Sequence, residues 1–228
     1  MFGIIISIVI FAIILIIGLI SFLTRNKHHD AQDGGNTHIS IFEPSNDRAG
    51  KKGELYANSH LRLLLEKDEH LLTGLLLPRK NGGFKAEVDA VLVTHKGVFC
   101  IETKHWIGKI SGNDLDKEWK QECFDERKSK THRNPVKQNQ SHCSYLEKIL
   151  NNRFYVENVV IFVALENGSE ISSEYTYTLR QFENYYNGLD KILTDKDIEF
   201  IHQRLKNYVA NESELKKNKQ LMKEYYKD

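Results

Sequence analysis

A carboxylate and an ammonium group stand two residues apart at the end of an apolar stretch of this chain. Glu102 and Lys104 follow directly on residues 98–101 (VFCI). Because alternate residues of a β-strand point to the same face, a strand that continues through 104 places both side chains on one face. Charged groups are costly to bury unless they are paired or bind an ion. The motif therefore calls for a chemical explanation.

A second carboxylate, Asp89, faces this motif across a predicted β-hairpin. The turn between the two strands is so short that it restricts their pairing. With residues 95–96 as the loop, Asp89 lies opposite Glu102. With residues 96–97 as the loop, Asp89 lies opposite Lys104. Either register gathers three ionisable groups on one side of the sheet.

Two neighbouring carboxylates repel each other, and a divalent cation is the natural compensation. Mg²⁺ accepts one or two carboxylates, retains water ligands and binds phosphate oxygens, and Mn²⁺ is an acceptable substitute. A nearby lysine can orient the attacking water and offset phosphate charge. We therefore expect Asp89 and Glu102 as metal ligands and Lys104 as the water-orienting cation of a phosphodiester hydrolase. Glu54 could supply a further ligand, because it lies on the inward stripe of a predicted helix.

The alternative is a structural salt bridge at the edge of the sheet. The Glu-x-Lys spacing is a weak signal, since average composition predicts about one occurrence in a chain of this size. It occurs three more times in charged segments, where solvated faces are expected: at 118–120, 126–128 and 214–216. Only the copy at 102–104 ends an apolar strand.

The elements that must position these groups alternate between helix and strand. We predict helices at 53–65, 136–150 and 195–209, strands at 71–78, 87–94, 97–105 and 157–165, and an exposed helix or frayed end at 211–228. Asn134-Pro135 is a favourable helix start. The segment between 108 and 133 is charged and predicted to be irregular. The order helix, three-strand meander, helix, strand indicates an α/β domain with C-terminal helices.

The N-terminus predicts a membrane anchor. Residues 2–23 (FGIIISIVIFAIILIIGLISFL) carry no charge and, at about 1.5 Å per residue, suffice to cross roughly 30 Å of hydrocarbon. A cleaved signal peptide is the alternative, but no basic residue precedes the run and no A-x-A-like site follows. Arg25 and Lys27 flank only its C-terminal side, which predicts a single-pass protein of the cell membrane with its C-terminal domain in the cytoplasm.

Composition excludes some classes of site. The net charge of the 228 residues is +1, so any polyanion site must come from local clustering of basic residues. The three cysteines, Cys100, Cys123 and Cys143, form no CxxC spacing, which argues against a disulfide framework or a standard zinc site.

One basic run could contact a nucleic-acid backbone. It precedes and enters the helix at 136–150 and consists of Arg127, Lys128, Lys130, Arg133 and Lys137. The alternative is a solvated charged face. Trp106 and Trp119 could stack on bases, although packing against the sheet is the expected role.

Several motifs in order resemble the NERD family, the nuclease-related domain. They are GEL at 53–55, EVDAVLVTHKGVFCIETKHWIGKISG at 87–112, Trp119, and NPVKQNQ at 134–140. The resemblance implies a restriction-endonuclease-like core, as in the PD-(D/E)xK superfamily. It also implies active-site roles for Glu54, Asp89, Glu102, Lys104 and Gln138, the last of which could hold water or phosphate as a neutral amide. The Pro-Asp pair of that superfamily is absent, because Val88 precedes Asp89.

The expected organisation is an anchor at 1–24, a linker at 25–48, a NERD domain at 49–165 and a helical extension at 166–228. The expected function is that of a membrane-anchored, Mg²⁺-dependent nuclease acting on nucleic acid, DNA rather than RNA. Two other functions stay open: a catalytically inactive, membrane-tethered module that binds nucleic acid or acts as a scaffold, and recruitment of a protein partner by the helices after about residue 194.

Overall fold

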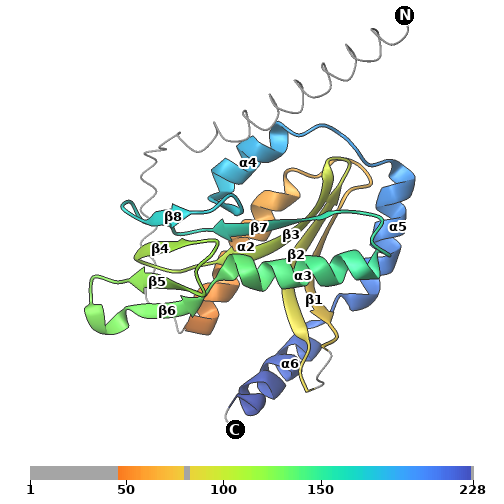
Figure 1. Cartoon of the computed structure of the whole chain (residues 1–228). Helices are drawn as coiled ribbons and strands as arrows, with labels where there is room; N and C mark the ends of the chain where they lie inside the picture. The colour runs from red at the N-terminus through yellow and green to blue at the C-terminus, as the bar shows by residue number, and fades with distance from the viewer. Residues whose placement is uncertain (1–45, 80–82, 227–228) are drawn as a thin grey trace, which may run out of the picture. The chain divides into compact units, whose positions relative to one another are not determined.

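The structure is a computed structural model that describes residues 46–79 and 83–226. It is a mixed α/β fold with two sheets and helices around them (Figure 1). The predicted anchor at 2–23 and almost all of the predicted linker at 25–48 lie outside the described residues. Within the described ranges, no helix combines the length and apolar character that crossing a bilayer requires.

The larger sheet has five strands in the order β1-β2-β3-β7-β9. The meander β1–β3 is antiparallel, whereas β7 lies parallel to β3 and β9 parallel to β7. Its strands are β1 (His70–Leu77), β2 (Ala86–Thr94), β3 (Gly97–Lys104), β7 (Val156–Phe162) and β9 (Thr176–Tyr177). The meander and the fourth long strand are thus confirmed, each within a few residues of its predicted bounds.

The turn between β2 and β3 fixes their register. Thr94 pairs with Gly97, so residues 95–96 form the loop, and Ala90 pairs with Ile101. Gly97 has a φ of 148°, a conformation that side chains disfavour. The first of the two predicted registers is therefore the one that forms.

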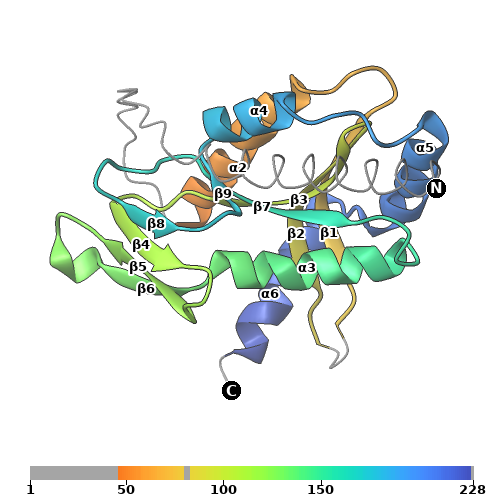
Figure 2. The ribbon, with the colours of Figure 1, turned by 45° about the horizontal axis from the view of Figure 1, so that its top comes forward.

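Each face of this sheet is covered by helices (Figure 2). Helix α3 (Pro135–Ile149) and helix α5 (Asp195–Leu205) bury one face in a core that includes Val91, Cys100 and Leu146. Helix α2 (Asn46–Arg62) and helix α4 (Leu179–Asn187) cover the other in a core with Phe99 and Ile101. These apolar faces hold the hairpin rigidly, which is what a precise site at its end requires.

The charged segment after β3 is ordered, contrary to the sequence prediction. It contributes most of a second sheet in the order β6-β5-β4-β8. Its strands are β4 (Lys109–Asn113), β5 (Glu118–Glu122), β6 (Lys130–Arg133) and β8 (Glu170–Ser172), with the short helix η2 (Glu126–Lys128) before β6. Trp119 anchors this sheet: it is fully buried in a core with Ile110 and Phe162. Trp119 and Ile110 are thus the buried side chains of strands whose alternation is too short to be read from the sequence.

The C-terminal region adds α5, the short helix η3 (Lys206–Tyr208) and α6 (Glu212–Tyr225). Helix α6 is held at the start of β2 by Asn218, whose amide accepts a hydrogen bond from Lys85 N (2.7 Å) and donates one to Lys85 O (3.0 Å). Asn218 is buried, whereas the other residues of α6 are exposed or half-buried. This pairing docks α6 next to the end of the hairpin where Asp89 lies.

Candidate active site

Asp89, Glu102 and Lys104 come together on one face of the β2–β3 hairpin. Ala90 pairs with Ile101, so Asp89, the residue before Ala90, lies opposite Glu102, the residue after Ile101. Lys104 Nζ donates to Glu102 Oε1 at 2.5 Å, and Asp89 Oδ2 accepts from Thr103 N at 2.8 Å. Only 5% of the Glu102 side chain and 15% of the Lys104 side chain are exposed. The predicted convergence of two carboxylates and a lysine is therefore what the backbone produces.

Without a bound cation, the negative charges of the cluster repel one another. Burial, followed by the charges of Glu102 and Glu54, raises the pKa of Asp89 well above its ordinary value. Burial opposes the charged form of Lys104, but Glu102 and Asp89 outweigh it, so the pKa of Lys104 is raised. Lys104 alone thus leaves negative charge uncompensated at Asp89.

Glu54 reaches the same site from helix α2. Burial raises its pKa, and Lys219, Glu87, Glu102 and Lys104 all act on its charge. The preceding residue explains how the helix can come so close. A Cβ on Gly53 would lie 2.8 Å from the Cβ of His105, just beyond the end of β3. Glycine in GEL is therefore what permits α2 to approach the strand.

Gln138 completes the predicted set from helix α3. Its Nε2 donates to Glu102 Oε1 at 3.0 Å. The next residue, Asn139, is fully buried and donates to Cys100 O (2.8 Å) and Asn158 Oδ1 (2.8 Å) on the two neighbouring strands. This asparagine fixes the first turns of α3 against the sheet, and so fixes Gln138 beside Glu102.

His142 belongs to the same site, although it was not among the residues predicted from the sequence. It lies one turn after Gln138 on α3, is 8% exposed, and holds its Nδ1 3.9 Å from Glu102 Oε2. That nitrogen is buried and has no hydrogen-bond partner among the described residues. Burial lowers the pKa of His142, which favours the neutral ring with an available lone pair. The i, i+4 spacing from Gln138 was the signal that could have revealed it.

Glu87 and Lys219 also border the site and were not predicted. Glu87 is two residues before Asp89 on β2, and Lys219 Nζ of α6 lies 3.6 Å from Glu87 Oε1. Burial is the main reason that the pKa of Glu87 is raised. No pattern in the sequence connects residue 219 with residue 87. The docking of α6, to which Asn218 contributes, brings them together.

The donor set fits a hard divalent cation. The described site holds four carboxylates (Glu54, Glu87, Asp89 and Glu102) and two lysines (Lys104 and Lys219), so negative charges exceed positive ones by two. One divalent ion would balance that excess. Carboxylate oxygens are the ligands that Mg²⁺ and Mn²⁺ prefer, and the unpartnered His142 Nδ1 provides a further polar atom.

The predicted basic run lies on the second sheet and the start of α3. It is distributed over η2 (Arg127, Lys128), β6 (Lys130, Arg133) and the first turn of α3 (Lys137). Arg127 is bound to Asp125 through two hydrogen bonds of 2.9 and 3.1 Å, and Lys137 donates to Leu115 O at 2.6 Å. Lys130 and Arg133 of this run are exposed.

An aromatic pair connects this second sheet with the cluster. Trp106 stacks on His132 of β6 (centroids 4.0 Å apart, 14° between planes), and Lys104 Nζ lies 5.6 Å from the Trp106 ring. Trp106 also contacts Phe162. The expectation that the tryptophans pack against the sheet holds for both, since Trp119 is fully buried.

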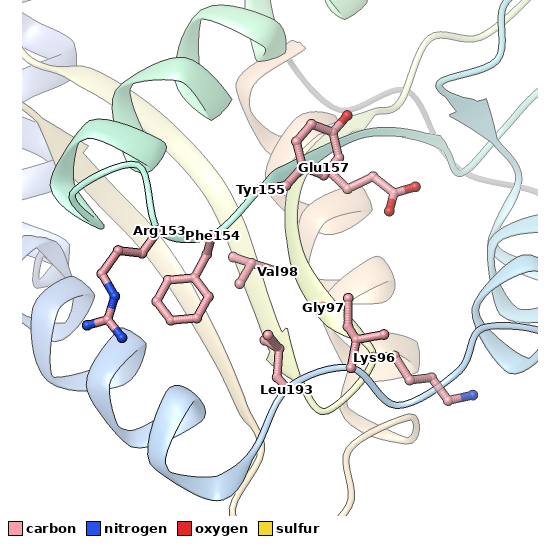
Figure 3. A pocket seen from close by; sticks show the side chains of 9 residues that line it. Lys96, Gly97, Val98, Arg153, Phe154, Tyr155, Glu157 and Leu193 are labelled. Atoms are coloured by element: carbon pink, nitrogen blue, oxygen red, sulfur yellow. The ribbon is translucent and has the colours of Figure 1, made fainter. Parts of the chain in front are cut away.

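A separate cavity of about 230 Å³ lies at the opposite end of β3, beside Gly97 and Val98 (Figure 3). Its charged side chains are Lys96, Arg153 and Glu157, and the first two point to opposite sides (Figure 3). Arg153 lies over the Phe200 ring at 4.7 Å and Lys96 donates to Tyr186 O. These groups are used structurally, so the ionisable cluster at 54, 89, 102 and 104 is the stronger candidate for chemistry.

The chain is similar to a known protein family. The family model described as the nuclease-related domain, NERD, matches residues 49–163. An uncharacterized protein of Bacillus anthracis is 25% identical over 144 residues, which cover 63% of this chain and 65% of that protein. The chain thus spans just under two thirds of the length of that relative. No solved structure matches. With the match covering half of its length and including every residue of the carboxylate cluster except Lys219, the chain belongs to the NERD family of nuclease-related domains.

Proposed function

We propose that this protein is a metal-dependent nuclease that hydrolyses phosphodiester bonds, with a restriction-endonuclease-like core. The observation that carries the proposal is the buried Asp89–Glu102–Lys104 cluster at the end of the hairpin. A structural salt bridge needs one carboxylate for one lysine. This site has additional carboxylates whose pKa values are raised by burial and mutual repulsion, a cost that a bound cation would offset.

Asp89 and Glu102 would hold Mg²⁺, which supplies charge neutralisation at the phosphate and a more acidic water. Glu54 approaches from α2 and can accept a hydrogen bond from a water in the site. Gln138 fixes Glu102 through its amide and can contact water or phosphate without altering the charge. Lys104 is held by Glu102 and offers its remaining protons to the attacking water and the phosphate.

The proposed substrate is nucleic acid, with DNA preferred over RNA. The exposed basic residues of β6 and the first turn of α3 would contact its backbone. We further propose that residues 2–23 anchor the protein in the cell membrane and leave the nuclease domain in the cytoplasm. This rests on the apolar sequence and its C-terminal positive charges.

The test uses the full chain, purified in mild detergent and incubated with DNA or RNA in Mg²⁺ or EDTA. We expect Mg²⁺-dependent cleavage that Lys104→Ala reduces by about 10²–10⁴-fold, the usual range for loss of a group that acts on charge or protons at the reacting centre. Lys120→Ala is the matched control, because it belongs to an exposed Glu-x-Lys on β5.

Two outcomes would contradict the proposal. Equal cleavage by the wild type and by Lys104→Ala would remove the assigned site. Salt-sensitive nucleic-acid binding without cleavage in any divalent metal would favour the inactive binding module instead.

A further inference from the structure

A second group of metal-ligating side chains lies outside the carboxylate cluster, where α5 crosses the start of the edge strand β1. His70 is the first residue of β1, and Glu199 and His202 lie on α5. One potential ligand atom from each lies within 4.8 Å of the other two. His70 pairs with Val93 of β2, four positions along the strand from Asp89, so this group is distinct from the proposed nuclease site.

The two elements orient these residues toward one another for simple geometric reasons. Residues three apart on a helix share a face, so Glu199 and His202 project together from α5. The same helix buries Ile198, Ile201 and Leu205 against the sheet, which sets its height above β1. His70 lies on that face of the sheet, and its ring stacks on His202 with centroids 3.8 Å apart and 24° between planes.

The ring nitrogens of both histidines lack hydrogen bonds to protein groups in the described part of the chain, whereas Glu199 accepts one from Gln203. Two imidazoles in contact favour the neutral state, because protonating both would place like charges side by side. Neutral imidazole is the form that binds metal.

We propose that His70, Glu199 and His202 form a binding site for a borderline transition-metal ion, with Zn²⁺ the best match. Two imidazoles and one carboxylate are a donor set that zinc uses, with a water in the fourth position. Asp68, whose carboxylate acts on His70, adds a second negative charge nearby. A hard ion such as Mg²⁺ prefers oxygen ligands and should not compete.

The site would fasten α5 to the strand at the edge of the sheet. Helix α5 begins the C-terminal region, which follows the matched NERD segment at 49–163. A bound ion that requires both elements in place stabilises the folded state by mass action. We therefore assign the site a structural role, and it does not depend on the proposed nuclease activity.

The experiment is a calorimetric titration of the untagged full chain with ZnCl₂, together with thermal unfolding. We expect zinc binding in the presence of excess Mg²⁺, and a rise in Tm of about 5–10 °C at a hundredfold excess over Kd. His202→Ala and the exposed Glu199→Gln should each weaken binding at least about tenfold and abolish most of the Tm rise. His60→Ala, a histidine of α2, is the matched control and should bind as the wild type does.

Two results would overturn the assignment. If the wild type, His202→Ala and Glu199→Gln all bind zinc equally, the ion is held elsewhere in the chain. If Asp89→Asn abolishes zinc binding while Glu199→Gln leaves it intact, the ion occupies the carboxylate cluster. Circular dichroism of each variant confirms that it is folded.

Discussion

Among the single residues, the carboxylates of the site interact most strongly because they lie close together. Asp89 is the most informative, because burial and its acidic neighbours raise its pKa rather than lower it. An acid with a raised pKa in the folded state binds a proton more tightly than in the unfolded state. Its contribution to stability therefore falls as pH rises from about 4 toward the folded-state pKa.

This gives a pH prediction for the metal-free protein. The free energy of unfolding of the wild type in EDTA should decrease as pH rises through that window, and Asp89→Asn should decrease less. Saturating Mg²⁺ should reduce the difference, because the ion replaces the proton. Denaturant unfolding of both proteins at several pH values measures it, and parallel pH profiles for the two proteins would contradict the assigned repulsion.

His142 gives a second prediction at this scale. Replacing it with alanine removes the unpartnered nitrogen beside Glu102. If that nitrogen helps to position the metal or its water, the apparent Mg²⁺ affinity should fall by about 10–100-fold, as for other residues that orient metal ligands. The measurement is the Mg²⁺ concentration for half-maximal cleavage. Unchanged Mg²⁺ dependence would make His142 a packing residue only.

At the scale of elements, helix α2 must approach β3 closely enough to deliver Glu54. A Cβ at Gly53 would meet His105, whereas a Cβ at Gly50 of the same helix would meet nothing within 4 Å. Gly53→Ala should therefore destabilise the protein by about 1–3 kcal/mol and reduce cleavage. Gly50→Ala should stabilise it by roughly 0.5–1 kcal/mol, with cleavage unchanged. Denaturant unfolding with a cleavage assay tests the pair, and equal effects of the two substitutions would refute the close approach.

One buried amide joins helix α6 to the backbone just before β2. Asn218→Ala removes both hydrogen bonds to the backbone of Lys85, at a cost of about 1–3 kcal/mol for the two. We expect faster hydrogen exchange in α6 and loss of the Lys219–Glu87 contact. Gln220→Ala is the control, since its amide contacts only the exposed Glu224. Equal exchange in the two variants would show that other contacts hold α6.

Some of these elements could be predicted from the sequence, and others could not. The β2–β3 hairpin and α3 were predictable, because their apolar patterns are long and their turn and cap residues, Gly97 and Asn134, are characteristic. The second sheet was not, because its strands are short and mostly exposed, with Trp119 as the main buried anchor. The contribution of Lys219 to the site could not be predicted either, because it follows from the tertiary packing of α6.

At the scale of the whole molecule, the net charge of +1 gives no general attraction to nucleic acid. Binding must then depend on local basic residues, and Lys130→Ala and Arg133→Ala on β6 should each lower the slope of log K against log salt by about one. Lys148→Ala, near the other end of α3, should leave the slope unchanged. Fluorescence anisotropy with a catalytically silent Asp89→Asn background measures it, and three identical slopes would exclude the β6 surface as the backbone contact.

Whether Asp89 and Glu102 share one divalent ion can be measured by Mn²⁺ binding followed by electron paramagnetic resonance. The account predicts a Mn²⁺ ion bound by the wild-type chain and by Glu118→Gln, the exposed counterpart on β5, with binding lost in both Asp89→Asn and Glu102→Gln. Mn²⁺ binding that survives in Asp89→Asn and in Glu102→Gln would contradict it.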